Sequence, residues 1–306
     1  MSGSGSDLNV TIGICVKNSE RTIRECLKSI LSQDYPRGLM EIIVVDGGSA
    51  DRTTDIAREM ISGSGIFVRF LCDNGKGLGT ARQMVLDNTR NKYVLWVDGD
   101  VVISKNFVRE QVNFMERKPK VGVATGNYIY RENEQETLAS LLQSLSKYVG
   151  STEFKDTNKY RGLPPNDASI YRVDASTQAG GFDMNIRGAS EDEDLIVRIM
   201  EKGWSLSVNK EAGFIASPRQ TWQSLWLERS WFGRGKHFLA HKHRNVRMRT
   251  PSIPLVYFVM GLKEGSKVYR LTAKKKSFLL SLYYVFVALA SWYGFVAAHM
   301  EGYGHE

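Results

Sequence analysis

Apolar residues in the first part of the chain follow two alternating patterns. Mainly apolar runs at 10–16, 41–45, 66–71 and 93–97 predict buried β-strands. Between these runs, apolar residues recur every three or four positions, as in residues 23–31, which predicts amphipathic helices. Strands that alternate with helices are typical of a mostly parallel sheet with helices on both faces. We therefore expect an α/β fold of the Rossmann-like kind.

The last quarter of the chain has a different pattern. Residues 278–300 contain no Asp, Glu, Lys or Arg, and the run exceeds the roughly 20 residues that a membrane-spanning helix needs. Three lysines at 274–276 stand directly before it, which predicts a cytoplasmic preceding domain. A second apolar run at 252–262 is too short to span a bilayer and suits the membrane interface or the protein body. A buried core helix is the alternative for 278–300.

These patterns divide the chain into three parts. Residues 1–6 contain only Met, Ser and Gly and predict a flexible tail. Residues 7–220 form the expected α/β domain. Residues 221–306 form the expected membrane-associated region, with an interfacial segment at 221–265 ahead of the apolar helix.

Polar side chains follow each of the four predicted strands. Asn18, Asp46 and Asp73 come after the first three strands, and Asp98 and Asp100 come after the fourth. Because the carboxyl ends of parallel strands meet at one edge of the sheet, these side chains should border one crevice. Side chains alternate along an extended segment, so Asp98 and Asp100 point the same way and offer oxygen ligands to a metal ion.

Two large classes of nucleotide-binding enzyme are disfavoured. The turn after the first strand contains no Gly-x-Gly-x-x-Gly, and no Gly-Lys-Ser/Thr phosphate loop occurs in the chain. An NAD-dependent enzyme or a P-loop enzyme is therefore not expected.

Charge and cysteine usage limit the partners and the compartment. The formal net charge is +8, and much of the basic excess lies close to the apolar helix, where it would attract anionic lipid. No recognisable helix-turn-helix, zinc-finger or RNA-binding aromatic motif accompanies this charge, so we do not expect nucleic acid as a partner. The three cysteines are odd in number and form no close pair, which predicts reduced thiols in a cytosolic body.

Residues 10–235 resemble the inverting family-2 glycosyltransferases of the GT-A fold, because a set of motifs occurs in the family's order. The motifs are Val16-Lys17-Asn18-Ser19-Glu20, Val44-Val45-Asp46-Gly47-Gly48-Ser49, Gly77-Leu78-Gly79-Thr80-Ala81-Arg82, Asp98-Gly99-Asp100, Gly180-Gly181-Phe182-Asp183 and Glu191-Asp192-Glu193-Asp194-Leu195. The resemblance implies transfer of a sugar from a nucleoside diphosphate, with Mg²⁺ or Mn²⁺ neutralising the departing diphosphate.

The resemblance also implies roles for the residues at the strand ends. Asp100 contacts the metal ion, and Asp98 holds the ribose or donor sugar and also reaches the metal. Asp46 accepts a hydrogen bond from the nucleotide base, in a pocket that Val16 and Asn18 line. Uridine is expected first, because N3–H of uracil is a donor, and guanine stays open. A turn-forming role is the alternative for Asp46.

Three further charged residues are candidates for nucleotide or phosphate binding. Asp73 stands at a strand end, and Lys76 and Arg82 flank the start of a predicted helix, where backbone N–H groups attract anions. Ordinary surface charges are the alternative for all three.

The acidic run at 191–194 opens a predicted helix, where carboxylates complement the helix dipole. By resemblance, Asp192 is the general base that takes a proton from the acceptor hydroxyl. Glu191 assists the acceptor, and Asp194 holds local structure.

A late arginine and tryptophan segment resembles one found in family members that work at membranes. Arg229 and Arg234 suit diphosphate oxygens, and Trp231 can stack on a sugar. An interfacial helix is the alternative, and the Gln-x-x-Arg-Trp form of processive synthases is missing. His237 and His241 have the i, i+4 spacing of a metal pair, and His237 is a candidate third ligand of the metal at Asp100.

The expected protein is a membrane-anchored, metal-dependent inverting glycosyltransferase. The general base argues for a hydroxyl acceptor, most simply a lipid-linked saccharide at the cytoplasmic face. A polyprenyl-phosphate sugar synthase is the enzymatic alternative, although its ionised phosphate needs no base. A non-catalytic sugar-nucleotide sensor or membrane scaffold is the alternative from another class.

Overall fold

The computed structural model describes residues 9–131, 136–153, 157, 167–186, 189–243 and 254–303. The predicted tail at 1–6 lies outside them. The described strands form one sheet in the order β3-β2-β1-β4-β7-β6-β8-β5. The strands are β1 (Val10–Val16), β2 (Met40–Asp46), β3 (Phe67–Cys72), β4 (Tyr93–Val97), β5 (Val101–Ile103), β6 (Val121–Tyr128), β7 (Ala168–Arg172) and β8 (Ser205–Ala216).

The first four strands run parallel, as the sequence pattern predicts. The second half of the sheet differs, because β7 pairs antiparallel with both β4 and β6, and β5 pairs antiparallel with β8. Only β6 and β8 are parallel there. The whole sheet is therefore mixed, and β4 lies at the junction of its two halves.

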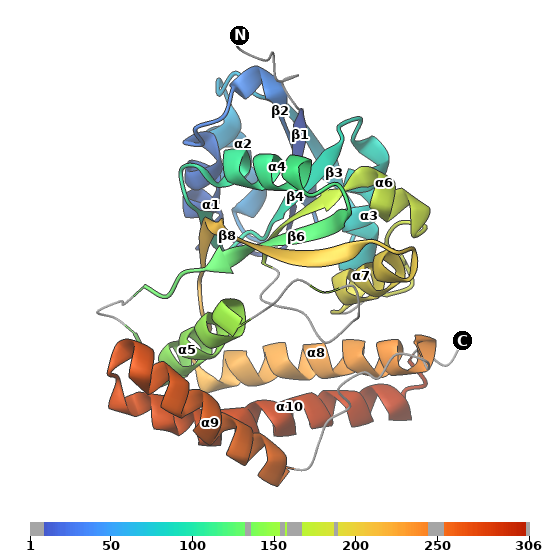
Figure 1. Cartoon of the computed structure of the whole chain (residues 1–306). Coiled ribbons are helices and arrows are strands. Elements are labelled where there is room, and N and C mark those ends of the chain that lie inside the picture. The colour runs from blue at the N-terminus through green and yellow to red at the C-terminus, as the bar shows by residue number, and fades with distance from the viewer. Residues whose placement is uncertain are drawn as a thin grey trace.

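Helices cover both faces of the sheet (Figure 1). Alternate strand residues pack on one face against α1 (Ile23–Leu31), α2 (Thr53–Ile61) and α4 (Phe107–Arg117). The other set packs against α3 (Leu78–Asn88), α6 (Val173–Gln178) and α7 (Glu191–Glu201). A short 3₁₀ helix, η1 (Arg37–Leu39), precedes β2. Burial on both faces explains why β1, β2 and β4 are almost continuously apolar. The prediction of a buried strand was wrong for β3, which is at the edge of the sheet and is only partly buried.

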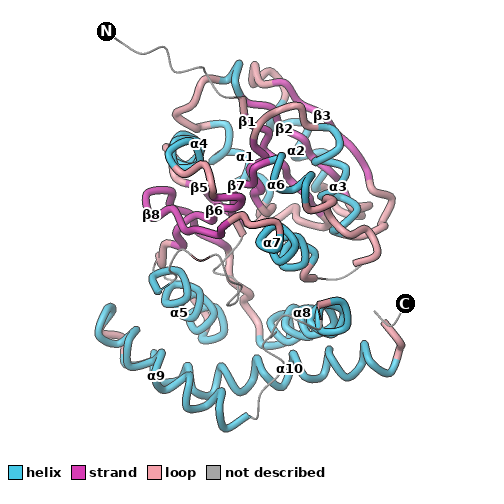
Figure 2. Tube along the Cα trace, turned by 45° about the vertical axis from the view of Figure 1, so that its right-hand side comes forward, coloured by secondary structure: helices cyan, strands magenta, loops and turns pink. Residues whose placement is uncertain are grey.

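Helix α5, from the middle of the chain, and the C-terminal helices form a second layer beneath the sheet domain (Figures 1 and 2). This layer contains α5 (Leu138–Glu153), α8 (Trp222–Lys242), α9 (Pro254–Thr272), η2 (Lys275–Leu279) and α10 (Leu280–Met300). A separate apolar core joins them, with Leu145 of α5, Leu225 of α8, Val268 of α9 and Tyr283 of α10 buried together. The described residues of the predicted interfacial segment at 221–265 form α8 and part of α9, and α9 extends beyond the short apolar run.

Small residues bring these helices into close contact. A side chain at Gly294 of α10 would collide with the backbone of Ser230 on α8, and one at Gly233 would collide with Ser291. Gly261 of α9 meets the backbone of α10 in the same way. Close approach through small residues is the usual way in which helices associate in membranes.

Helix α10 has an exposed apolar face along its whole length. The segment Lys275–Met300 is long and apolar enough to cross a membrane by length and composition, and 39% of an apolar 18-residue stretch within it is buried inside the protein. Most of the exposed apolar side chains lie three, four or seven positions apart, which places them on one face. They are Leu282, Leu289, Trp292, Tyr293, Val296 and Met300. The opposite face packs on α8 and α9, so α10 is buried on one face and exposed on the other.

Replacing Gly294 should loosen the attachment of α10. Gly294→Val forces the two helix backbones apart, and we expect a loss of about 1–3 kcal/mol in the free energy of unfolding. Leu289→Val on the exposed face is the matched control and should change little. Thermal unfolding and limited proteolysis of the purified proteins in detergent test this, and equal midpoints for both variants would contradict the packing.

Candidate active site

Arg82 on α3 is the centre of a buried charge cluster. Its guanidinium lies 3.2 Å from Oδ1 of Asp98 and 2.7 Å from Oε1 of Glu191, and Oδ2 of Asp192 is 3.8 Å away. The Arg82 side chain is only 6% exposed and lies over the ring of Trp96. One cation therefore faces three carboxylates from two separate places in the chain, the connection after β4 and the first turn of α7. The sequence-predicted residues Arg82, Asp98, Glu191 and Asp192 are together.

Asp98 and Asp100 occupy the connection between β4 and β5. Burial within the acidic cluster raises the pKa of Asp98 to about 7, although Arg82 opposes this shift. Burial also raises the pKa of Asp100. Both side chains still have accessible surface, 40% for Asp98 and 29% for Asp100, so a ligand can reach them. Crowded carboxylates that resist ionisation provide a donor set that a hard divalent cation fits, since its charge would offset their repulsion.

Gly99 is required by packing between these two aspartates. A Cβ at this position would stand 2.7 Å from Cγ1 of Val16, at the end of β1. Val16 itself is buried, and its carbonyl accepts a hydrogen bond from the N–H of Gly47. The ends of β1, β2 and β4 therefore meet at one place, as the strand pattern predicts.

Two cations and a third carboxylate near Asp100 were missed by sequence reasoning. Arg219, which follows β8, lies 4.0 Å from Oδ2 of Asp100. Lys147 on α5 forms an ion pair with Asp167 at 2.7 Å and also attracts Asp100. The N–H of Asp98 donates to the carbonyl of Asp167. The sequence offered one signal for Lys147, because a lysine within the mainly apolar segment of α5 is unusual. The neighbouring residues did not indicate that it would lie near Asp100.

Helix α7 begins beside Arg82 with its acidic first turn. Ser190 precedes it in the left-handed region, with φ at 78°. Glu191 is 3% exposed, and burial raises its pKa to about 8 despite the Arg82 contact. Asp192 is 22% exposed, and its Oδ1 accepts a hydrogen bond from the N–H of Glu193. Asp192 is therefore the more accessible carboxylate, and Glu191 is held by the arginine.

Asp194 holds the far side of α7 in place. Its carboxylate is fully buried and accepts hydrogen bonds from His243 at 2.7 Å and from Arg198. Burial favours protonation, but these partners prevail and lower its pKa to about 2. Lys242 lies 2.9 Å away. Asp194 therefore joins the first turn of α7 to Lys242 and His243 at the end of α8.

Asp46 shapes the turn after β2 beside a small cavity, and Asn18, from the connection after β1, is hydrogen-bonded to that turn. Asp46 accepts hydrogen bonds from the N–H groups of Gly48 and Ser49, and Asn18 accepts one from Ala50. The turn-forming alternative for Asp46 is thus present. A cavity of about 150 Å³ adjoins it, lined by Val16, Val44, Asp46, Thr54, Ala57, Arg58, Phe70, Leu71 and Cys72. Each carboxylate oxygen has two lone pairs, so Asp46 can still accept from a ligand.

Asp73 and Lys76 lie on the turn that leads into α3. The Asp73 carboxylate is buried and accepts from the N–H groups of Gly75 and Gly77, so it shapes the turn. Lys76 is exposed at the tip. The hydrogen bonds of Asp73 explain its presence through the shape of the turn. The exposed position of Lys76 would allow it to contact an anion.

The candidate residues on α8 lie along the contact with α10. Arg229 is close to Glu228 and hydrogen-bonds Tyr283. Trp231 is 38% exposed beside Phe232. Arg234 forms an ion pair with Glu301. None of these contacts involves the Asp98 to Asp100 segment.

His237 also belongs to the α8–α10 contact. Its ring lies near His241, Phe295 and His299. With a rise of 1.5 Å per residue, His237 is about 22 Å along the axis from Trp222, the first residue of α8. His237 is grouped with His241 and His299 in the described residues, and its role as a ligand of a metal at Asp100 stays a prediction.

The fold and the acidic cluster can now be compared with known proteins. A family profile described as glycosyl transferase family 2 matches residues 11–176, more than half of the chain. The chain belongs to glycosyl transferase family 2. The match includes the strand-end residues from Asn18 to Asp100 and ends before α7.

Two curated relatives with similar sequences are much longer proteins. Glycosyltransferase GlyA of Streptococcus pneumoniae is 34% identical over 130 residues, which are 42% of this chain and 18% of GlyA. The poly(ribitol-phosphate) beta-N-acetylglucosaminyltransferase TarS of Staphylococcus aureus is 33% identical over 99 residues, 32% of this chain and 17% of TarS. The chain thus matches less than a fifth of either relative.

Solved glycosyltransferases share the fold over nearly the whole chain. The mannosyltransferase PcManGT from Pyrobaculum calidifontis, solved with GDP-Man and Mn²⁺, has a TM-score of 0.59 at 16% identity, covering 96% of this chain and 76% of PcManGT. S. aureus TarS 1-349 with UDP-GlcNAc has a TM-score of 0.52 at 17% identity, covering 96% and 92%. The fold is of the GT-A type, as the sequence resemblance implied.

The raised pKa of Glu191 predicts a pH-dependent stability. The folded protein keeps a proton on Glu191 that the unfolded chain, with a pKa near 4.5, releases. Stability therefore falls as pH rises from 4.5 towards about 8, and Glu191→Gln removes this loss. We expect the variant's advantage in the free energy of unfolding to grow by about 1.4 kcal/mol per pH unit up to that value. Thermal unfolding in metal-free buffer tests this, and a constant difference between the two proteins would contradict it.

Proposed function

We propose that this protein is a metal-dependent inverting glycosyltransferase. It transfers a sugar from a nucleoside diphosphate, with a UDP-sugar favoured, to a hydroxyl group of the acceptor. The observation that carries the proposal is the placement of Arg82, which joins Asp98 on the donor side to Glu191 and Asp192 on the acceptor side. Groups that could neutralise the leaving diphosphate and a group that could deprotonate the acceptor hydroxyl therefore lie within reach of one substrate.

The donor side of the site would hold the diphosphate and its ion. Asp100 and Asp98 supply carboxylate oxygens for Mg²⁺ or Mn²⁺, which when bound neutralises charge on the leaving diphosphate. Arg219 and Lys147 stand beside Asp100 and can approach the phosphate oxygens. Their present partners, Glu228 and Asp167, keep both cations near the site before a donor arrives.

The acceptor side would supply the general base. Asp192 is accessible and can accept the proton of the acceptor hydroxyl as its oxygen attacks the anomeric carbon. Glu191 is buried against Arg82 and would position the acceptor through that contact. Attack from the Asp192 side while the diphosphate leaves towards Asp100 inverts the configuration of the sugar.

The cavity beside Asp46 would hold the nucleotide base. Phe70 and Arg58 line it, and the Arg58 guanidinium lies 4.4 Å from the centre of the Phe70 ring. These planar groups suit a heterocycle, and Asp46 can accept from N3–H of uracil. PcManGT was solved with GDP-Man and TarS with UDP-GlcNAc, so guanine is the alternative that a donor panel must include.

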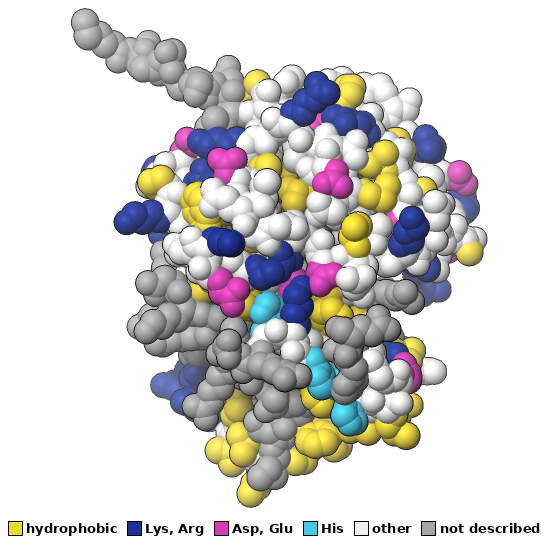
Figure 3. All heavy atoms as spheres, turned by 90° about the vertical axis from the view of Figure 1, so that its right-hand side faces the viewer, with side chains coloured by type: hydrophobic (Ala, Val, Ile, Leu, Met, Phe, Trp, Pro, Cys, Tyr) yellow, Lys and Arg dark blue, Asp and Glu magenta, His cyan; other side chains and the backbone are white. Residues whose placement is uncertain are grey.

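The acceptor would be a lipid-linked saccharide presented at a membrane. The apolar face of α10 and the exposed apolar side chains of α9, including Leu255 and Val259, provide an apolar surface that suits the lipid interface. Figure 3 shows hydrophobic side chains gathered at the lower end of the molecule. Because α10 lies along α8, a position in the plane of the interface is favoured over a span.

A polyprenyl-phosphate sugar synthase is the weaker alternative. A phosphate acceptor is already ionised, so it needs no base, and the accessible Asp192 would then have no role.

Removing the base should abolish transfer without removing the donor. Asp192→Asn cannot take a proton, so we expect turnover to fall by roughly 10²- to 10⁴-fold while donor affinity stays within about twofold. Asp100→Ala should instead lose the stimulation by Mn²⁺. Purified proteins assayed on a panel of UDP- and GDP-sugars, with calorimetric donor binding, provide the test.

Asp174→Asn is the matched control, since Asp174 is an exposed carboxylate in the first turn of α6. Near-normal transfer by Asp192→Asn would show that the base is another group. Unchanged metal dependence in Asp100→Ala would place the ion elsewhere.

Charges on the exposed face of α10 should weaken membrane binding. We expect Leu289→Glu with Val296→Glu to reduce co-flotation with vesicles containing anionic lipid at least tenfold, because buried charge is costly in the interface. Phe67→Glu on β3, also at an exposed apolar residue, is the control and should bind like the wild type. Equal flotation of all three proteins would exclude this face as the attachment surface.

A further inference from the structure

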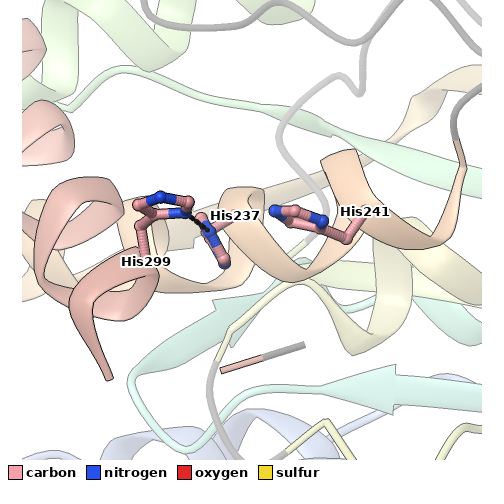
Figure 4. Close-up of side chains that lie close together, drawn as sticks. All are labelled: His237, His241 and His299. Carbon is pink, nitrogen blue, oxygen red and sulfur yellow. Dashed lines mark hydrogen bonds between the residues drawn. The ribbon is translucent and has the colours of Figure 1, made fainter. Parts of the chain in front are cut away.

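Three histidines form a cluster where α8 and α10 end. His237 and His241 are one helical turn apart on α8, and His299 lies near the end of α10 (Figure 4). One nitrogen from each ring can be chosen so that all three lie within 4.8 Å of one another. Imidazole nitrogen is a preferred ligand of Zn²⁺ and related transition metals.

The backbone fixes the tautomer of the central ring. Nδ1 of His237 lies 2.7 Å from the carbonyl oxygen of Tyr303. A carbonyl only accepts, so Nδ1 carries the hydrogen, and the lone pair of His237 is on Nε2. That nitrogen lies 3.2 Å from Nδ1 of His299. Metal-binding histidines commonly donate their second nitrogen to a carbonyl in this way, which orients the ring.

The spacing of the rings matches the size of a zinc site. Two nitrogens bound to a tetrahedral Zn²⁺ at ~2.0–2.1 Å stand about 3.3 Å apart, close to the distance between His237 and His299. The His241 ring lies 4.5 Å from the His237 ring between centroids, on the same helix face. A small side-chain rotation brings its nitrogen to the third corner.

We propose that His237, His241 and His299 bind one Zn²⁺ ion, with water as the fourth ligand, and that this ion ties α10 to α8. His237 is fully buried, whereas His241 is partly exposed and His299 is exposed, so an ion can enter from solvent. The site is separate from Asp98 and Asp100, whose carboxylate oxygens favour Mg²⁺ or Mn²⁺. The proposal does not depend on the transfer reaction.

Binding should be measured on the full chain without a histidine tag. After EDTA treatment and its removal, we expect ZnCl₂ to bind once per chain with a Kd of micromolar or tighter and to raise the unfolding midpoint. MgCl₂ at the same concentration should do neither. With Co²⁺ in place of zinc, visible absorption of a tetrahedral nitrogen site should appear.

Variants then locate the ion. His299→Ala and His241→Ala remove ligands from accessible positions, and each should weaken zinc binding at least tenfold and abolish the cobalt absorption. Glu301→Gln is the matched control, because it breaks the ion pair with Arg234 at the same helix end and leaves all three imidazoles. It should bind zinc like the wild type.

No zinc binding by the wild type, or unchanged affinity in His299→Ala, would overturn the proposal. Loss of binding in Glu301→Gln as large as in His299→Ala would also overturn it, since the imidazoles would then not define the site.

Discussion

One buried guanidinium connects the two halves of the candidate site. Arg82 is on α3, and its partners Asp98 and Glu191 come from the end of β4 and the start of α7. Three carboxylates close to one cation cannot all ionise cheaply, so the cluster holds protons or attracts further positive charge. Loss of the guanidinium would leave buried acids unpaired and would separate the loops. The acidic cluster would thus favour a bound cation, and the same contact fixes the distance between Asp98 and the start of α7.

The elements of the fold that depend on the local hydrophobic pattern could be predicted from the sequence. The first four strands and the polar residues at their ends follow from hydrophobic runs, because burial on both faces leaves a continuous apolar signal. The antiparallel position of β7 was not predictable, since its neighbours β4 and β6 are set by long-range pairing. Lys147 and Arg219 were missed for the same reason. Each is an ordinary charge in the sequence and gains its meaning from Asp100, which is distant in the chain.

Helix α8 shows a different limit of sequence reasoning. Arg234 and His237 follow the tryptophan-rich start of α8 closely in sequence. This closeness suggested that they share one donor site with Arg229 and Trp231. A helix of 21 residues is about 30 Å long, however, and nearness in sequence does not bring side chains together along it. Their partners, Glu301 and His299, belong to the end of α10, and these partners could be recognised only after the two helices were aligned.

The position of α8 has a geometric consequence for an acceptor in a membrane. One face of α8 meets the sheet domain, where Gly235 contacts the backbone of Ala189, and another face meets α10. A single helix, about 10 Å thick, therefore separates the acidic crevice from the apolar surface. The proposed lipid-linked acceptor would have to span this thickness for its hydroxyl group to reach Asp192. The length of the linkage between lipid and sugar would then determine which acceptors are substrates.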